Sequence, residues 1–186
     1  MTEWRDCTAF FFPLQSEGEK EWLHKVTRNY GFLTAEIEAG RAGSGESHHW
    51  VGLPVRLQAI STEECRVLAI SYYNADFEAH ITNSPAAWER FCISFTTACI
   101  ELDPLVAVTF GFPSDDIRYD IKRYDPAISA EDGAWLRAQT YELMYLCREL
   151  DVDAQNDSPS TDLPGFVLTN GGRVTAGPFG RSLPLP

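Results

Sequence analysis

Three side chains that could bind a metal or transfer a proton are spaced two residues apart: Asp76, Glu78 and His80. They alternate with apolar residues over 76–82, and this pattern is typical of a strand with one buried face. Two carboxylates and an imidazole on one strand face suit a divalent metal or general acid–base chemistry. The solvated face of any half-buried strand produces the same alternation. The segment therefore predicts a strand, with a small metal-dependent hydrolase as one possible function.

A second candidate is the glycine-rich segment 40–50, which contains two histidines. Glycines let a backbone wrap around a phosphate, but the Gly-Lys-Ser/Thr ending of a P-loop is missing here. His48 and His49 are adjacent, so in an extended chain their side chains point in opposite directions. We interpret 40–47 as a mobile surface loop and Trp50 as an aromatic anchor for a partner.

The third candidate, segment 114–125, alternates acidic residues with tyrosines directly after an apolar run. Tyrosine provides contact area at a small cost in entropy, and carboxylates can imitate the phosphates that bind in a basic cleft. We predict a partner-binding patch, the alternative being a solvated segment that neutralises its own acids. Together with Trp50, the predicted partner-binding residues are Asp115, Asp116, Tyr119, Asp120, Tyr124 and Asp125.

The sequence lacks the common motifs of hydrolytic enzymes. It has no Gly-x-Ser-x-Gly elbow and no His-Glu-x-x-His. Its five cysteines form no Cys-x-x-Cys pair, and their odd number does not indicate a disulfide framework. Cys92 and Cys99 lie in an apolar helical pattern and are expected to be small buried hydrophobes. These features favour a binding protein over an enzyme, and no cofactor or metal is predicted.

The charge balance points to the class of partner. Twenty-seven acidic residues against fifteen basic ones give the 186-residue chain a net charge of -12. Such a surface repels phosphate backbones and anionic lipid heads, so we expect neither nucleic-acid nor membrane binding and favour a basic protein partner. No signal-peptide pattern and no run of ~18 apolar residues is visible. A cytoplasmic, reducing location is therefore expected, and the oligomeric state is not predicted.

The elements that would position these residues follow from apolar periodicity. Helices are expected after Ser16, after Ser84 with Pro85 at its first position, and over 129–150. A hairpin is predicted around Asn170-Gly171, a preferred turn pair. The expected strands cover 7–14, 32–39, 50–60, 65–73, 76–82 and 105–112. Short hairpin links outnumber strand–helix–strand units, which predicts an α+β fold, a largely antiparallel sheet with two or three helices packed on it.

The domain organisation is expected to be simple. A chain of this length is typical of one domain, here 1–186, because a single core can be buried without disulfides. The acidic Ser/Pro segment 151–163 is interpreted as a flexible loop, and 180–186 as a frayed tail.

The middle of the chain resembles a known protein class. Trp88-x-x-Phe91, then Leu102-Asp103-Pro104-Leu105 and the aromatic-glycine strand Phe110-Gly111-Phe112, is similar to a pattern in immunity proteins of bacterial polymorphic-toxin systems. Val106 stands where that pattern has a tyrosine. The resemblance covers about the middle third of the chain and implies a small cytosolic α+β protein that blocks a cognate toxin. It assigns no site residues.

The leading hypothesis is thus a non-enzymatic acidic inhibitor of the immunity type, which masks a basic toxin or nucleic-acid enzyme. A phage-encoded antagonist would fit the same observations. Two alternatives stay open: the metal-dependent hydrolase based on Asp76, Glu78 and His80, and a small-ligand-binding domain with an aromatic pocket. The aromatic residues of that pocket would be Trp50, Tyr72 and Tyr73.

Overall fold

The computed structural model describes residues 5–29, 34–37, 46–112, 117–139, 141–147, 150, 165–169 and 172–175. Within these residues nine strands form one sheet in the order β2-β3-β4-β5-β1-β6-β7-β8-β9, and every neighbouring pair is antiparallel. The strands are β1 (Arg5–Pro13), β2 (Thr34–Ile37), β3 (Glu46–Trp50), β4 (Leu53–Ser61), β5 (Cys65–Tyr73), β6 (Val106–Phe112), β7 (Leu143–Cys147), β8 (Gly165–Thr169) and β9 (Gly172–Thr175).

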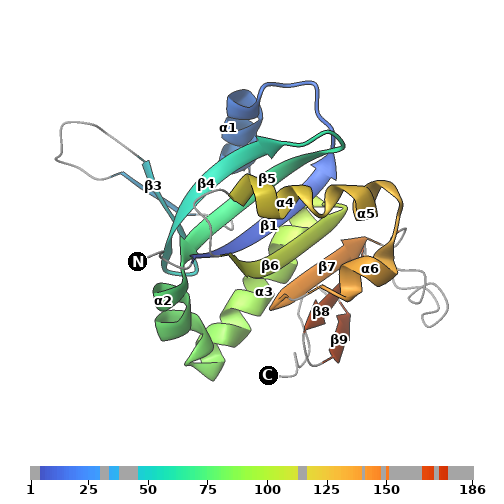
Figure 1. The fold of residues 1–186 in the computed structure, drawn as a ribbon. Coiled ribbons are helices and arrows are strands. Elements are labelled where there is room, and N and C mark those ends of the chain that lie inside the picture. Colours follow the sequence, from blue (N-terminus) through green and yellow to red (C-terminus); the bar gives the residue numbers. More distant parts are fainter. Residues whose placement is uncertain are drawn as a thin grey trace.

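Helices cover both faces of this sheet (Figure 1). They are α1 (Glu19–Asn29), α2 (Asn74–Phe77), the π-helical turn η1 (Glu78–Thr82), α3 (Pro85–Leu102), α4 (Ile117–Lys122), α5 (Asp125–Ser129) and α6 (Gly133–Arg137). The long helix α3 lies behind the sheet in Figure 1, and α4, α5 and α6 lie in front of it. The predicted α+β fold with an antiparallel sheet is confirmed.

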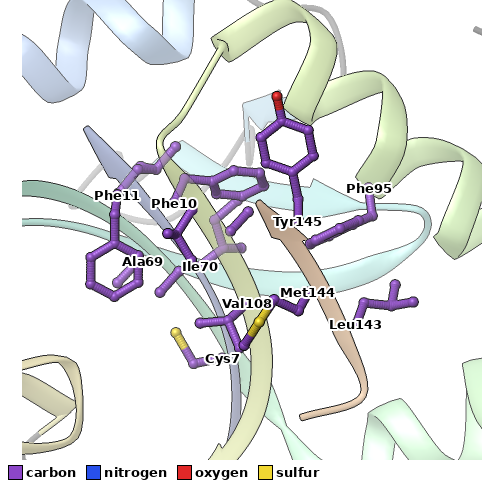
Figure 2. Packing of buried hydrophobic residues seen from close by; sticks show 14 of the residues in the cluster. Cys7, Phe10, Phe11, Ala69, Ile70, Phe95, Val108, Leu143, Met144 and Tyr145 are labelled. Atoms are coloured by element: carbon purple, nitrogen blue, oxygen red, sulfur yellow. The ribbon is translucent and has the colours of Figure 1, made fainter. Parts of the chain in front are cut away.

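The central strand β1 supplies the core on both sides. Cys7, Ala9, Phe10 and Phe11 are fully buried. Because side chains alternate along a strand, Phe10 and Phe11 point to opposite faces (Figure 2). Phe10 packs against Phe95 of α3, with ring centroids 6.1 Å apart. Phe11 packs against Tyr124, at 5.5 Å, next to α5. One strand therefore joins the two helical layers.

Helix α3 has the termini that its sequence predicts. The Ser84 hydroxyl accepts a hydrogen bond from the Ala87 backbone N–H at 3.4 Å, and Pro85 occupies the first turn, where no N–H donor is needed. Asp103 adopts a left-handed φ of 49° and ends the helix. Cys92 and Cys99 are buried on this helix, as predicted.

The predicted strand over 76–82 is wrong, because the segment forms α2 and η1. Phe77 and Ile81 lie four residues apart and are each 2% exposed, whereas Ala79 between them is exposed. A spacing of four places residues on one helical face. The Asn83 backbone N–H donates to the Glu78 carbonyl five residues earlier, the bond that defines the π-helical turn. An alternating apolar pattern this short fits a helix as well as a strand.

The predicted helix over 129–150 is also wrong. Glu131 takes a left-handed φ of 54°, and the Asp132 carboxylate then accepts from the Trp135 backbone N–H at 2.9 Å to begin α6. The five residues Leu143–Cys147 are all buried, and they form β7 between β6 and β8. Periodicity alone does not separate a short buried strand from a helical segment, and here strand pairing decided the outcome.

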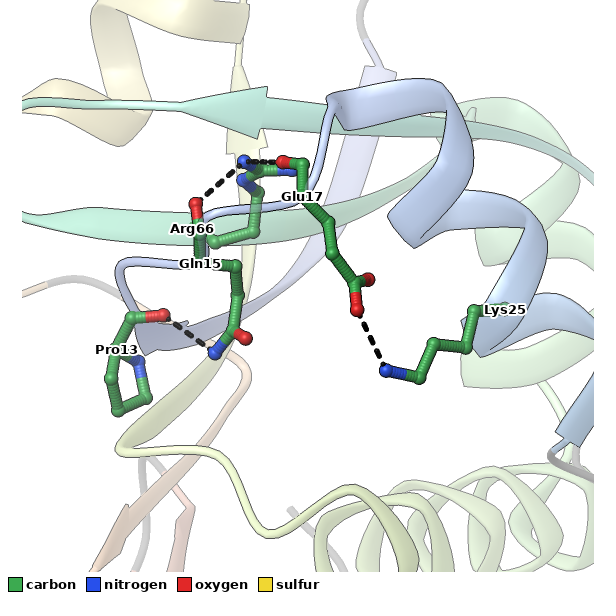
Figure 3. Close-up of polar contacts among 5 residues, drawn as sticks. All are labelled: Pro13, Gln15, Glu17, Lys25 and Arg66. Carbon is green, nitrogen blue, oxygen red and sulfur yellow. Dashed lines mark hydrogen bonds and ion pairs between the residues drawn. The ribbon is translucent and has the colours of Figure 1, made fainter.

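The connection from β1 to α1 is fixed by a buried arginine (Figure 3). Arg66 of β5 is 4% exposed and donates through Nη2 to the backbone oxygens of Gln15 at 3.2 Å and Glu17 at 2.6 Å. Its guanidinium also lies over the Trp22 ring of α1, 5.6 Å from the centroid. Arg66 thereby holds α1 against the sheet.

Other sequence expectations have mixed outcomes. The strand predicted over 65–73 coincides with β5, and β8 pairs with β9 as a hairpin, although Asn170-Gly171 lies outside the described residues. So do the predicted flexible loop 151–163 and tail 180–186. All five cysteines are buried. Within the described part of the chain, no helix is long and apolar enough to cross a membrane.

Candidate functional site

The antiparallel topology gathers polar side chains at one end of the sheet. Asp6 lies near the start of β1, Asn74 directly follows β5, and Glu142 directly precedes β7. Asp6 pairs with Tyr72 of β5 on one side and Gly111 of β6 on the other. The beginnings of β1 and β7 therefore meet the ends of β5 and β6, and residues far apart in sequence become neighbours.

A pocket of about 300 Å³ opens at this end. Its lining combines three carboxylates with an amide, a hydroxyl and two aromatic rings. The described lining residues are Asp6, Asn74, Phe77, Glu78, Thr82, Trp88 and Glu142, and they include no cation. Glu78 and Glu142 are exposed. We refer to this cavity as the acidic pocket.

The carboxylate at the base of the acidic pocket is unusual. Asp6 is 6% exposed, and its Oδ2 accepts a hydrogen bond from Asn74 Nδ2 at 3.0 Å. Burial raises the pKa of Asp6 to about 6, and the negative charges of Glu142 and Glu78 add to this rise, while the Asn74 hydrogen bond opposes it. Perturbed carboxylates of this kind are concentrated at functional sites.

A glycine leaves room for this carboxylate. A Cβ at position 111 would lie 3.1 Å from Asp6 Oδ1, closer than ordinary contact. Gly111 belongs to the aromatic-glycine strand that the sequence singled out. Its lack of a side chain allows the buried carboxylate of Asp6 to lie against β6.

The aromatic wall of the acidic pocket is part of the core. Phe77 is 2% exposed and Trp88 is 4% exposed. Both contact Phe91 of α3, with ring centroids 5.1 and 6.1 Å away. The Trp88 indole N–H is buried and has no hydrogen-bond acceptor among the residues that the structure describes. The wall is therefore rigid and contains an unused donor.

Trp50, which was predicted to be an aromatic anchor for a partner, is not at the surface. It is the last residue of β3 and is fully buried. Its ring lies 4.9 Å from that of Phe91, and its Nε1 donates to Ser94 Oγ at 2.7 Å. Trp50 thus anchors β3 to α3 instead of offering a ring to a partner.

The predicted patch 114–125 is divided between surface and core. Tyr119 is 78% exposed and Asp120 is half-buried, both on α4. Tyr124 is fully buried, and Asp125 is 8% exposed and accepts a hydrogen bond from Thr62 Oγ1 at 2.7 Å. The last two residues therefore connect elements of the fold. The structure does not describe Asp115 and Asp116.

The predicted metal site required Asp76, Glu78 and His80 to share one face of a strand, and the structure does not have this arrangement. In α2 and η1, Glu78 cannot share one face with Asp76 and His80, because residues two apart are about 200° around a helix axis. No group of three or more potential metal ligands lies together in the described ranges. Of the three residues, only Glu78 belongs to the acidic pocket.

The proposed aromatic ligand pocket does not assemble either. Trp50 and Tyr72 are buried in the core, and the Tyr72 hydroxyl is hydrogen-bonded to Thr8 Oγ1 at 3.1 Å. Tyr73 is 47% exposed, on the other face of the strand, and Arg5 lies over its ring at 5.0 Å. The three aromatic side chains therefore do not line a common cavity.

Four of the five cysteines are poor nucleophiles at neutral pH. Burial raises the pKa of Cys65 and of Cys92 to about 12, and holds the pKa values of Cys7 and Cys99 well above their usual range. The thiolate is the reactive form of cysteine. These side chains therefore act as small apolar groups.

Sequence reasoning missed Asp6, Asn74 and Glu142. Asp6 directly precedes the apolar run of β1, and Glu142 directly precedes that of β7. A carboxylate at the start of a buried strand is a usable signal, because strand ends lie at the rim of a sheet. For Glu142 the signal was hidden by the helical interpretation of 129–150.

No family model and no curated protein matches the chain. Among solved structures, the Pseudomonas aeruginosa T6SS protein PA0821 is similar over 94% of this chain and 67% of its own, at 13% sequence identity and a TM-score of 0.36. The likeness is remote, so any function assigned to this chain has to come from its own side chains.

Proposed function

We propose that this protein is an acidic binding protein that covers a basic surface of a partner protein, in the manner of the immunity proteins that its middle third resembles. The observation that carries the proposal is the acidic pocket. Asp6 of β1, Glu78 of η1 and Glu142, which precedes β7, converge there, and no described lining residue is a cation. Uncompensated charge at a rigid concave site favours a ligand of opposite charge.

The remaining acidic side chains support the same class of partner. Among the described carboxylates only Asp6 and Asp125 are buried. One ion pair joins described residues, between Lys25 Nζ and Glu17 Oε1 at 3.0 Å. Most of the described acidic side chains are therefore exposed or half-buried, where they would attract a basic protein and accelerate its association.

The exposed Tyr119 next to the half-buried Asp120 supplies a second contact region in this proposal. Tyrosine is enriched at protein interfaces because one side chain offers both apolar area and a hydroxyl. Tyr119 and Asp120 would extend the interface at α4, and Asp115 and Asp116 stay predicted contacts.

The test is a defined binding measurement. Proteins retained by the immobilised chain at low ionic strength are identified, and the most basic one is purified and titrated with the chain by calorimetry. We expect a saturable complex whose affinity falls steeply with salt and in which the partner's toxic or enzymatic activity is lost in proportion to occupancy. A partner that retains full activity when saturated, or an affinity independent of salt, would contradict the proposal.

A further inference from the structure

We infer that the acidic pocket receives one arginine side chain of the partner, with the guanidinium lying among the carboxylates of Asp6, Glu78 and Glu142. This inference rests on the proposed function and names the chemical group that the site recognises. It is carried by the contents of the cavity: three carboxylates, one amide and an aromatic wall.

The occupant has to be cationic. Asp6 is buried beside Glu78 and Glu142, so three like charges share a space of about 300 Å³ that no described cation enters. Burying the Asp6 carboxylate next to the negative charges of the exposed Glu78 and Glu142 is unfavourable unless an opposite charge accompanies it. A cation that enters the pocket removes this repulsion.

The shape of the site favours a guanidinium over a metal ion. No described group of three ligands is placed to hold a metal, and the cavity volume suits a side chain. A guanidinium has five donors in a planar fork, which match several carboxylate oxygens, and it stacks on aromatic faces such as those of Phe77 and Trp88. An ammonium ion is a more strongly hydrated point charge with three donors.

The arginine belongs to a protein and is not the free amino acid. Free arginine carries an α-carboxylate, and the described lining of the pocket offers only negative and neutral groups around it. A residue within a chain instead presents a peptide carbonyl. The buried Trp88 N–H has no hydrogen-bond acceptor among the described residues, and the peptide carbonyl oxygen could accept from it.

A titration of the isotope-labelled full chain with N-acetyl-arginine amide tests the inference by NMR. We expect saturable shifts of the Trp88 indole and Asn74 side-chain signals. N-acetyl-citrulline amide, which has the same shape without the charge, should produce none, and the lysine analogue should bind more weakly. Equal responses to arginine and citrulline, or no response to arginine, would overturn the inference.

A matched pair of variants separates the pocket from general acidity. Glu78→Gln with Glu142→Gln, and Glu63→Gln with Glu64→Gln, each remove two exposed charges, the second pair lying at the β4–β5 turn. We expect the first pair to weaken binding of N-acetyl-arginine amide about tenfold or more, and the second about twofold or less. Equal losses would overturn the inference.

The same variants distinguish this inference from the proposed function. If a basic partner binds and both double variants weaken it equally, the acidic protein has a partner but the pocket does not recognise an arginine of it. If the arginine probe binds the pocket while no basic protein is inhibited, the pocket inference holds and the proposed function fails.

Discussion

Two cavities lie on the face of the sheet that carries α3, and their charges are opposite. The acidic pocket is at the start of β1, whereas a groove of about 450 Å³ runs between α1 and β4. The groove is lined by Leu23, Thr27, Val55 and Leu57 together with the basic or titratable residues Lys20, His24, His48 and Arg56, and no carboxylate is among its described lining residues.

The two regions also differ in how firmly their side chains are held. Asp6, Phe77 and Trp88 of the pocket are at most 6% exposed, while Lys20, His24 and Arg56 of the groove are exposed. A charge fixed in a rigid, desolvated cavity selects geometry, and a charge on a solvated side chain acts mainly through long-range attraction. Within the described residues, a protein with a net charge of -12 thus has both a partly buried acidic site and an exposed basic strip.

The largest expected contrast is in stability. Phe77→Ala would remove a side chain that is 2% exposed from the pocket wall, and we expect the free energy of unfolding to fall by about 3–5 kcal/mol. Leu23→Ala in the half-buried groove should cost only about 1 kcal/mol. Denaturant unfolding followed by tryptophan fluorescence measures both. Similar losses of stability would show that the groove wall is packed as tightly into the core as the pocket wall.

The next contrast concerns the stability cost of the buried carboxylate. The folded pKa of Asp6, about 6, lies above the usual 3.8, so the folded state binds the proton more tightly than the unfolded state. Stability is therefore lost as pH rises from about 4 through 6. Asp6→Asn should stabilise the protein by about 1–3 kcal/mol at pH 7 and by almost nothing at pH 4.

The control for this prediction is Arg56→Gln in the groove. Because Arg56 is exposed, its loss should change thermal stability little at either pH. A stability gain for Asp6→Asn that is the same at pH 4 and pH 7 would show that the benefit does not come from the charge.

Binding of the arginine probe should depend on pH through the ionisation of Asp6. If the arginine probe requires ionised Asp6, its affinity should fall about tenfold per pH unit well below pH 6. The charged groups facing Asp6 are Glu78 of η1 and Glu142 before β7, with neutral Asn74 as the hydrogen-bond donor. NMR titrations at several pH values measure this. In Asp6→Asn the transition near pH 6 should disappear, and its persistence would assign the titration to another group.

The smallest effect is expected from the groove. Lys20→Glu with Arg56→Glu should speed association of a basic partner a few fold at low salt, because the groove then ceases to repel it. High salt should abolish the difference. Stopped-flow association rates measure this. A large change in dissociation rate would mean that the groove forms part of the interface.

Much of the fold could be predicted from the sequence, and the site could not. Continuous apolar runs identified β1, β5 and β6, because strands buried on both faces have such runs. The Ser-Pro start identified the beginning of α3, because it is typical of a helix N-terminus. Two short segments, 76–82 and 143–147, fit a strand and a helix equally well. Both were assigned incorrectly. The first contributes Phe77, Glu78 and Thr82 to the acidic pocket, and Glu142 of the pocket directly precedes the second.

The sequence by itself determined that the protein is acidic, that Cys92 and Cys99 are buried and that the sheet is largely antiparallel, since these follow from composition and local pattern. Only the tertiary structure decided which acids act together. Asp6 and Glu142 stand far apart in the chain and meet because antiparallel pairing brings the starts of β1 and β7 to one end of the sheet. The tertiary structure also buries Trp50 and Tyr124, because their rings pack in the core and are not left at the surface. Which residues face one another is a property of strand register, and local sequence patterns do not contain it.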